Sequence, residues 1–350
     1  MASTVASFSS FSPACAQQQT WTVDAHGQAD FETIQEAIDN AADGDIIFVR
    51  AGTYCEHIIV NKMVSLIGED VNMTVMDGNE TGHVIEIVSD NVNITGFTVQ
   101  NGGRNLGDAG IYLENASLCS ISENHVSDNF AGIWFEESSR NLIAANDIMG
   151  NMDDGIVFNY SHNNTVSGNH IAFHEYFGIV INWSHNNTIS CNNVTQTVGP
   201  SHGDKINLWK SSHNTIFQNH VEENNRYGIR VEGQSNNNTI SDNMIGNCLT
   251  GLQLYDSSNF NYVYENNVAQ CSDGIDINKH STQNTVSNNT ITDNEICGLQ
   301  VYNTEDNLID SNNLRNNWAG IGAIDRSIGV TVVVWISSVG PIRMCLVAIR

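Results

Sequence analysis

Residues 155–171 read GIVFNYSHNNTVSGNHI, and residues 178–194 read GIVINWSHNNTISCNNV, so one phrase is written twice with an offset of 23 residues. Its opening dipeptide, Gly-Ile or Gly-Leu, recurs at Gly110, Gly132, Gly155, Gly178, Gly228, Gly251, Gly274, Gly298 and Gly320. Lys205-Ile206 fills the same place in one further unit, and successive units are 22 to 27 residues apart. The chain is therefore a tandem repeat, and its fold follows from what one unit does.

Each unit contains short β-branched segments separated by polar turns, and it has no helical stripe. Apolar residues fall into columns when the units are aligned. One column holds Val166, Ile189, Ile216, Ile240, Val263 and Val286. Another holds Ile171, Val194, Val221, Ile245, Val268 and Ile291. We expect these columns to face a shared core, because a unit this small cannot bury its own apolar face.

Three short strands per unit predict an all-β fold, a parallel β-helix of about a dozen coils that rise about 4.8 Å each. The chain has 48 Asn, and 17 of them align as two ladders in which each amide can bond its copies above and below. A leucine-rich-repeat horseshoe has an overlapping period. It is disfavoured because Ile and Val outnumber Leu at the core positions.

The remaining segments set the expected boundaries. Residues 1–20 are a signal-like or disordered leader, with Ala14-Cys15-Ala16 in the form of a signal-peptidase site. Residues 21–324 are one β-helix domain, and a capping helix at about 31–42, N-capped by Asp30, covers its open end. Residues 325–350 form an atypical apolar tail, interpreted as a badly fitting or foreign tail rather than a true cap.

The opening resembles a known superfamily. Residues 31–39 (FETIQEAID), 44–49 (GDIIFV), 51–54 (AGTY) and 66–68 (LIG) look like the start of right-handed β-helix proteins of the pectin-lyase-like superfamily. The later Asn-Asn-Thr-Ile phrases resemble NosD-like carbohydrate-binding and sugar-hydrolase (CASH) repeats. The resemblance implies that the fold is a right-handed parallel β-helix, and it leaves activity open because such proteins include lyases, hydrolases, epimerases and binding modules.

The amino-acid composition limits the classes of binding partner. A formal net charge of −26 argues against binding to nucleic acid through phosphates and against docking on anionic lipid. The apolar C-terminal run is too short for a membrane span and is interrupted by Pro341 and Arg343. An acidic, Asn-rich solenoid is typical of extracellular, cell-surface or periplasmic proteins, and its expected partner is a polysaccharide or other glycan.

Three functions remain open at this point. The first is a non-catalytic carbohydrate-binding protein of the cell surface. The second is a lyase, glycoside hydrolase or uronate epimerase acting on acidic polysaccharide. The third, implied by the resemblance to NosD, is a copper-related accessory role. The sequence requires no cofactor, although calcium or copper is compatible with it.

A ligand face is predicted from the alternation of side chains along the first strand of each unit. Residues two and four after the glycine point outward there and include aromatic, acidic and Arg side chains. The expected substrate-binding residues are Asn207, Trp209, Arg230, Tyr255 and Asp276. If the protein is an enzyme, Asp204 or Glu232 would be the acid/base, with His202 and Arg230 on the substrate's charge.

Two further pairs stand in equivalent places of neighbouring units. His162 and His185 are candidate metal ligands, although no third ligand is evident. Cys248 and Cys271 would lie about 4.8 Å apart at Cα, within the range of a disulfide. We expect a bond or a contact between them in an oxidising compartment.

Overall fold

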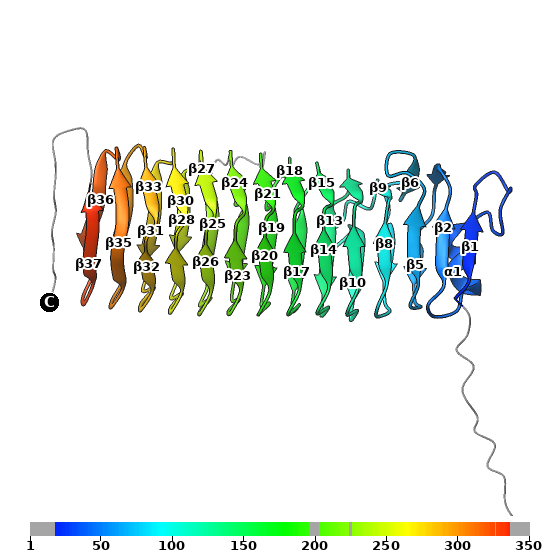
Figure 1. Cartoon of the computed structure of the whole chain (residues 1–350), viewed down its shortest axis with the longest axis horizontal. Helices are drawn as coiled ribbons and strands as arrows, with labels where there is room; N and C mark the ends of the chain where they lie inside the picture. Colours follow the sequence, from blue (N-terminus) through cyan, green and yellow to red (C-terminus); the bar gives the residue numbers. More distant parts are fainter. Residues whose placement is uncertain (1–17, 197–202, 224–225, 326, 337–350) are drawn as a thin grey trace, which may run out of the picture.

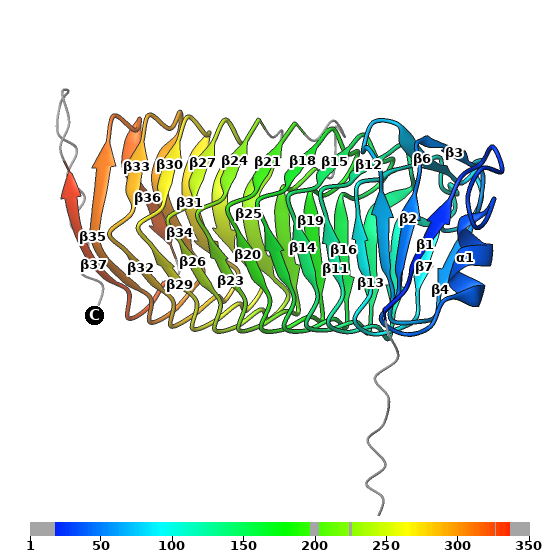
Figure 2. The same ribbon diagram turned by 45° about the vertical axis from the view of Figure 1, so that its right-hand side comes forward.

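The computed structural model describes residues 18–196, 203–223, 226–325 and 327–336. These residues form a right-handed parallel β-helix, as predicted, whose coils stack along one long axis (Figures 1 and 2). In the described part, sheet A has 25 strands and sheet B has 12, which agrees with the expected dozen coils. All named strand pairs are parallel, so neighbouring strands always belong to successive coils.

Sheet A consists of two rows of short strands. The first row is β1 (Thr20–Val23), β2 (Ile46–Val49), β5 (Ser65–Gly68), β8 (Asn93–Thr95), β11 (Ser120–Ser122), β14 (Leu142–Ala144), β17 (Thr165–Ser167), β20 (Thr188–Ser190), β23 (Thr215–Phe217), β26 (Thr239–Ser241), β29 (Tyr262–Tyr264), β32 (Thr285–Ser287), β35 (Leu308–Arg315) and β37 (Thr331–Ile336). The second row is β3 (Gly52–Tyr54), β6 (Thr74–Asp77), β9 (Thr98–Gln100), β12 (His125–Ser127), β15 (Asp147–Met149), β18 (His170–Ala172), β21 (Asn193–Thr195), β24 (His220–Glu222), β27 (Met244–Gly246), β30 (Asn267–Ala269) and β33 (Thr290–Thr292).

Sheet B is made of the first strand of each repeat unit. Its members are β4 (Ile58–Val60), β7 (Ile85–Ile87), β10 (Ala109–Glu114), β13 (Ala131–Glu136), β16 (Ile156–Asn159), β19 (Ile179–Asn182), β22 (Ile206–Trp209), β25 (Tyr227–Glu232), β28 (Thr250–Leu254), β31 (Asp273–Asn278), β34 (Cys297–Tyr302) and β36 (Ala319–Asp325). The two aligned apolar columns of the sequence pair in register between sheet A strands, and their side chains are fully buried or nearly so. The core is thus a stack of Ile and Val layers enclosed by three short strands per coil.

The N-terminal helix is shorter than predicted. α1 spans Ile34–Asn40, and its N-cap is Thr33, whose hydroxyl accepts a hydrogen bond from the Glu36 backbone N–H. Asp30 is not the cap, because its carboxylate accepts hydrogen bonds from both the N–H and the hydroxyl of Thr22 in β1. Ile34 and Ile38 are buried, and α1 covers the first coils at one end of the stack (Figure 2).

Asparagine ladders join the coils in one direction. Asn164 is typical: its Oδ1 accepts from the Asn141 backbone N–H at 2.8 Å, and its Nδ2 donates to the Ser138 carbonyl at 3.0 Å. Both partners lie in the preceding coil, so each ladder side chain satisfies backbone groups that come before it in the chain. Because these groups are buried, the ladder prevents a large desolvation cost.

A third ladder, not foreseen from the sequence, runs through Asn129, Asn151 and His174. His174 replaces an Asn closely: its Nδ1 receives the Asn151 backbone N–H and its Nε2 lies 3.0 Å from the Ile148 carbonyl. Nδ1 must accept in this arrangement, so the ring is neutral with its proton on Nε2. Burial agrees with this, because it lowers the pKa of His174 to about 4.

The glycine that opens each unit is required by close packing. A Cβ at Gly132 would lie 2.5 Å from the Gly155 carbonyl oxygen and 2.7 Å from Ile148 Cγ2. Lys205 occupies this slot in the longest of the regular repeat units, where its side chain is fully buried, and burial lowers its pKa to about 7.

Part of the predicted atypical tail joins the stack as strand β37. β37 pairs in parallel with β35, with Thr331 opposite Leu308 and Ile336 opposite Leu314. The rest of the expected tail, residues 337–350, and the expected leader up to residue 17 lie outside the described residues. Among the residues that the structure describes, no helix has the length and apolar character needed to cross a membrane.

Candidate functional site

The outer face of sheet B collects most of the residues that the sequence singled out. Strand register aligns the position two after the glycine as Tyr112, Trp134, Val157, Val180, Asn207, Arg230, Gln253, Asp276 and Gln300. It also aligns Glu114, Glu136, Asn159, Asn182, Trp209 and Glu232 two residues further on. All of these side chains lie opposite the core, and one continuous face results.

Much of this face is covered. Asn207 is 3% exposed, Gln253 is 5% and Asp276 is 6%. The sequence predicted an open column, but side chains about 4.8 Å apart on successive strands shield one another. The first residue of β25 adds further cover, because Arg230 lies over the ring of Tyr227 with 4.6 Å between its guanidinium and the ring centroid.

A polar network joins four of the predicted residues in the middle of the face. Asn207 Nδ2 donates to Asp204 Oδ2 at 3.2 Å and to Glu232 Oε1 at 3.0 Å. Glu232 Oε2 in turn pairs with Arg230 Nη2 at 3.0 Å. Three of the four residues predicted to carry catalysis, Asp204, Glu232 and Arg230, therefore lie in one connected polar group. His202, the fourth, lies outside the described residues.

The network continues toward the C-terminal coils. Arg230 Nε donates to Gln253 Oε1 at 2.9 Å, and Gln253 Nε2 donates to Asp276 Oδ2 at 2.7 Å. The Arg230 guanidinium also lies 5.0 Å from the centroid of the Tyr255 ring. Arg230 thus contacts neighbours on both sides and is largely buried.

Two carboxyl groups of this network are electrostatically unusual. Burial raises the pKa of Asp204 to about 6, although Arg230 and Arg226 act in the opposite direction. Burial likewise raises the pKa of Asp276 to about 6. The Oδ1 atoms of both side chains are buried and form no hydrogen bond. Such groups are able to exchange protons near neutral pH.

An aromatic strip borders the network. Trp183 and Trp209 meet edge to face with centroids 4.1 Å apart, and Tyr160 stacks on Trp183 at 5.2 Å. The Lys210 ammonium lies 4.5 Å from the Trp209 ring centroid. Trp209, predicted to bind substrate, is therefore part of a cation–aromatic cluster next to Asn207 rather than an isolated ring.

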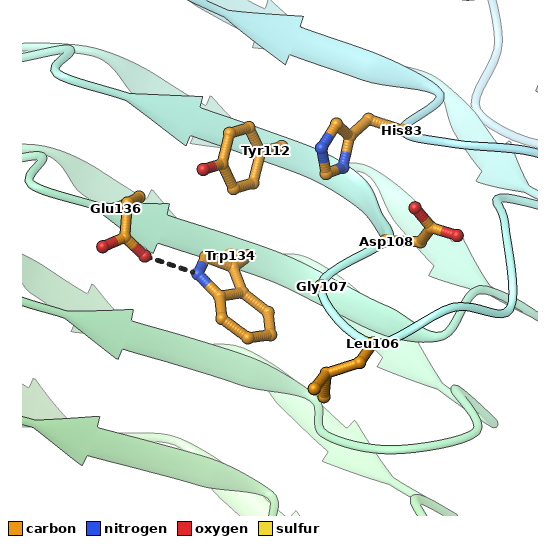
Figure 3. A pocket seen from close by; sticks show the side chains of 7 residues that line it. All are labelled: His83, Leu106, Gly107, Asp108, Tyr112, Trp134 and Glu136. Carbon is orange, nitrogen blue, oxygen red and sulfur yellow. Dashed lines mark hydrogen bonds between the residues drawn. The ribbon is translucent and has the colours of Figure 1, made fainter.

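A cavity of about 280 Å³ opens on the same face nearer the N-terminus (Figure 3). Tyr112 and Trp134 come from the adjacent strands β10 and β13, and His83 stacks on Tyr112 with centroids 4.1 Å apart and planes 10° from parallel. Leu106, Gly107 and Asp108 come from the loop before β10, and Glu136 completes the lining. Figure 3 shows Glu136 and Asp108 toward opposite ends, with the aromatic rings between them.

The pocket was only half visible in the sequence. Tyr112, Trp134 and Glu136 stand in the predicted outward columns, but His83 and Leu106 belong to no repeated position. The loop at 101–108 is the signal that was missed, because loops on a rigid scaffold are where binding sites form. Its shape is fixed locally: Asp108 Oδ2 accepts from the backbone N–H of Asn105 at 2.9 Å.

The predicted metal pair does not converge on one point. The rings of His162 and His185 are stacked, with centroids 5.2 Å apart and planes 9° from parallel. His162 Nδ1 accepts the backbone N–H of His185, and His185 Nδ1 accepts that of Ser212. Within the part of the chain that the structure describes, no group of three or more His, Cys, Asp or Glu side chains is placed to hold a metal ion.

The two predicted disulfide partners lie in neighbouring coils as free thiols. Cys271 stands in the third ladder, since its backbone N–H donates to Asn294 Oδ1 at 3.0 Å. A hydrogen bond with the Cys248 side chain lowers the pKa of the Cys271 thiol. The thiols are therefore in contact, and the disulfide itself stays a prediction.

Comparisons with known proteins place the chain in a wider context. A family model described as periplasmic copper-binding protein (NosD) matches residues 38–203 and 196–334. The cell surface glycoprotein of Methanothermus fervidus is 40% identical over 108 residues, which is 30% of this chain and 17% of that relative. Both matches are to proteins described as lying outside the cytoplasm.

Solved structures share the architecture at low identity. The A-module of mannuronan C-5 epimerase AlgE4 from Azotobacter vinelandii has a TM-score of 0.67 and 15% identity, covering 86% of this chain and 94% of that one. An alginate lyase from Paenibacillus sp. str. FPU-7 has a TM-score of 0.59 and 16% identity, covering 77% and 94%. These structures show the fold alone. The family match spans most of the coils described above, and the chain therefore belongs to the NosD family of β-helix proteins.

Proposed function

We propose that this protein acts outside the cytoplasm as a glycan-binding β-helix protein, and that the outer face of sheet B is its binding surface. The observation that carries the proposal is the aromatic-walled cavity at Tyr112 and Trp134. The aromatic strip at Trp183 and Trp209, further along the stack, adds to it. Sugar rings have apolar faces and polar edges, so they stack on aromatic rings and bond to polar groups beside them.

The spacing of the face suits a chain-like ligand. Trp134 and Arg230 are four strands apart in sheet B, which is about 19 Å at about 4.8 Å per strand. Several sugar units of a polysaccharide laid along the axis would reach both the cavity and the cationic middle of the face. A rigid scaffold limits the entropy lost on binding such a ligand.

The cavity is built to bind rather than to react. Both carboxylate oxygens of Glu136 are held by Asn159 Nδ2, at 2.9 and 2.8 Å, and one of them also faces Trp134 Nε1 at 3.3 Å. Burial raises the pKa of Tyr112 to about 12, so its hydroxyl keeps its proton. The Tyr112 hydroxyl is therefore not set up to give up its proton at neutral pH, and the Glu136 carboxylate is occupied by two hydrogen-bond donors, which supports a non-catalytic role.

The test compares variants on immobilised glycans. Trp134→Ala should reduce retention strongly, and Arg230→Ala combined with Trp209→Ala should abolish retention on an acidic polysaccharide. Tyr262→Ala is the matched control, because this exposed ring lies on sheet A, away from the proposed surface. If the sheet B variants and the control are retained equally well, the proposed surface is wrong.

A second candidate, processing of an acidic polysaccharide, is favoured by one specific observation. Asp204 and Asp276 each have a raised pKa and a buried Oδ1 atom without a hydrogen bond, and Arg230 lies between them in the network. In that reading Arg230 binds a uronate carboxylate and Asp204 or Glu232 transfers the proton. Incubation with uronic-acid polysaccharides, followed by detection of unsaturated products and reducing ends, discriminates it from binding alone, with Asp204→Asn as the variant.

Copper, which the family's description names, fits the described residues poorly. Copper sites take imidazole or thiolate ligands that converge on one ion. The stacked rings of His162 and His185 use their Nδ1 atoms on backbone N–H groups, so only the two Nε2 atoms of this pair are open to a metal. A copper-related role is therefore not part of the proposal.

A further inference from the structure

Within the part of the chain that the structure describes, the acidic groups that line the cavity on sheet B, Glu136 and Asp108, form no ion pair with a cationic side chain. Glu136 is held by the neutral donors Asn159 and Trp134, and Asp108 is held by the backbone N–H and the side-chain amide of Asn105. Neutral donors stabilise a carboxylate without cancelling its charge. Among the described residues, these two carboxylates therefore face the cavity with neutral hydrogen-bond donors as their partners.

Neighbouring side chains add further acidic groups around the cavity. Glu86 stands beside Tyr112 in the strand register, and Glu114 stands beside Glu136. His83 contributes no opposing charge, because its Nδ1 accepts the backbone N–H of Ala109 and burial lowers its pKa. A uronate sugar in this cavity would meet repulsion from several carboxylates.

The floor of the cavity is aromatic. Tyr112 and Trp134 lie on adjacent strands, and Figure 3 shows their rings between the two acidic ends of the cavity. A positive charge is attracted both to the face of an aromatic ring and to a carboxylate beside it. A ligand that offers an apolar ring face and one ammonium group would satisfy the aromatic floor and one acidic end of the cavity at once.

We propose that the cavity binds a sugar carrying a free amino group, with the ring on Tyr112 and Trp134 and the ammonium against Glu136. The inference rests on the proposed glycan-binding function and adds the class of sugar. The cationic middle of the face, around Arg230, is about 19 Å away and would not meet the same sugar unit. The full ligand is thus a glycan whose amino sugar lies at the N-terminal end of the face.

The experiment measures calorimetric binding of three short oligosaccharides to the full chain: a glucosamine dimer, its N-acetylated form and a digalacturonate. The glucosamine dimer should bind at least about tenfold more tightly than the N-acetylated dimer at low salt, and the difference should shrink at high salt. Glu136→Gln should remove the preference, and Trp134→Ala should weaken both glucosamine-based dimers. Asp108→Asn, at the other end of the cavity, should retain most of the preference because the ammonium is placed against Glu136, and it shows whether the loss in Glu136→Gln belongs to the Glu136 end.

A strongly acidic protein attracts any cation, so a charge-matched control is essential. Glu305→Gln removes the same charge from an exposed site far along the stack. If it lowers affinity for the amine as much as Glu136→Gln does, the attraction is non-specific and the inference fails. Equal or tighter binding of the N-acetylated or acidic dimer, still dependent on Trp134, would also overturn the inference while leaving glycan binding intact. Absence of binding to all three dimers and to immobilised glycans would count against the proposed function itself.

Discussion

A change of one ladder amide to a carboxyl tests the main stabilising device of the fold. Asn238 is 1% exposed, and its Oδ1 accepts from the backbone N–H of Asn214 at 2.8 Å. Its Nδ2 donates to the Ser211 carbonyl and to Asn261 Oδ1, both at 3.0 Å. Asn238→Asp keeps the shape of the side chain and removes only this donor group.

The expected loss follows from the two broken hydrogen bonds. Each is worth about 1 kcal/mol, and two buried acceptors are then left facing a carboxylate oxygen, so the free energy of unfolding should fall by about 4 kcal/mol at pH 7. Burial raises the pKa of the new carboxyl above its unfolded value near 3.9. The folded state therefore binds the proton more readily, and the variant regains stability as the pH falls toward 4.

The neighbouring residue provides the control. Asn237 is exposed, with φ of 56°, and Asn237→Asp makes the same chemical change one residue away. Urea unfolding followed by far-UV circular dichroism at pH 7 and pH 4 gives the midpoints of both variants. Equal midpoints at pH 7, or a difference that does not shrink at pH 4, would refute the view that the ladder amides hold the coils together.

Three further outcomes are expected. Gly132→Ala should lower the melting temperature and reduce the free energy of unfolding by about 2 kcal/mol, because the added methyl group meets the backbone of the next coil. Gly246→Ala is the control: its added Cβ would have its nearest neighbour at 3.3 Å, so the loss should be less than about 1 kcal/mol. The folded-state pKa of Lys205, about 7, is below the unfolded value near 10.4, so the unfolded chain binds more protons between these values and wild-type stability should rise with pH across them. Lys205→Met should flatten that part of the stability profile, and an unchanged slope would rule Lys205 out as its source. Cys248 and Cys271 should form a disulfide under mild oxidation, seen as two fewer titratable thiols in denaturant before reduction than after it; equal counts would exclude the bond.

The repeat made the fold predictable because its spacing sets the strand register. The glycine columns predicted which residues pair, and Ile179 does stand opposite both Ile156 and Ile206. The extent of the helix was less predictable, since Asp30 and Thr33 are both good N-cap residues. Only the partner in β1 decides that Asp30 is used elsewhere.

The site was partly hidden for two physical reasons. A repeat shows which residues point outward, but not which of them neighbours will cover, so the burial of Asp276 and Gln253 was not visible in it. The pocket depends on His83 and the loop at 101–108, which have no counterpart in other units. The third ladder escaped notice because His174 interrupts its run of Asn, even though a neutral imidazole makes equivalent hydrogen bonds.

The one-way direction of the Asn ladders has a consequence for how this chain is made. A ladder side chain in one coil completes buried backbone groups of the coil before it, as Asn164 does for Asn141 and Ser138. A newly emerged coil therefore stays incomplete until its successor arrives, and assembly from the N-terminus advances with a lag of one turn. The same dependence lets evolution lengthen the molecule by inserting whole units, since each inserted unit brings the amides that its predecessor needs and in turn receives its own from the unit that follows.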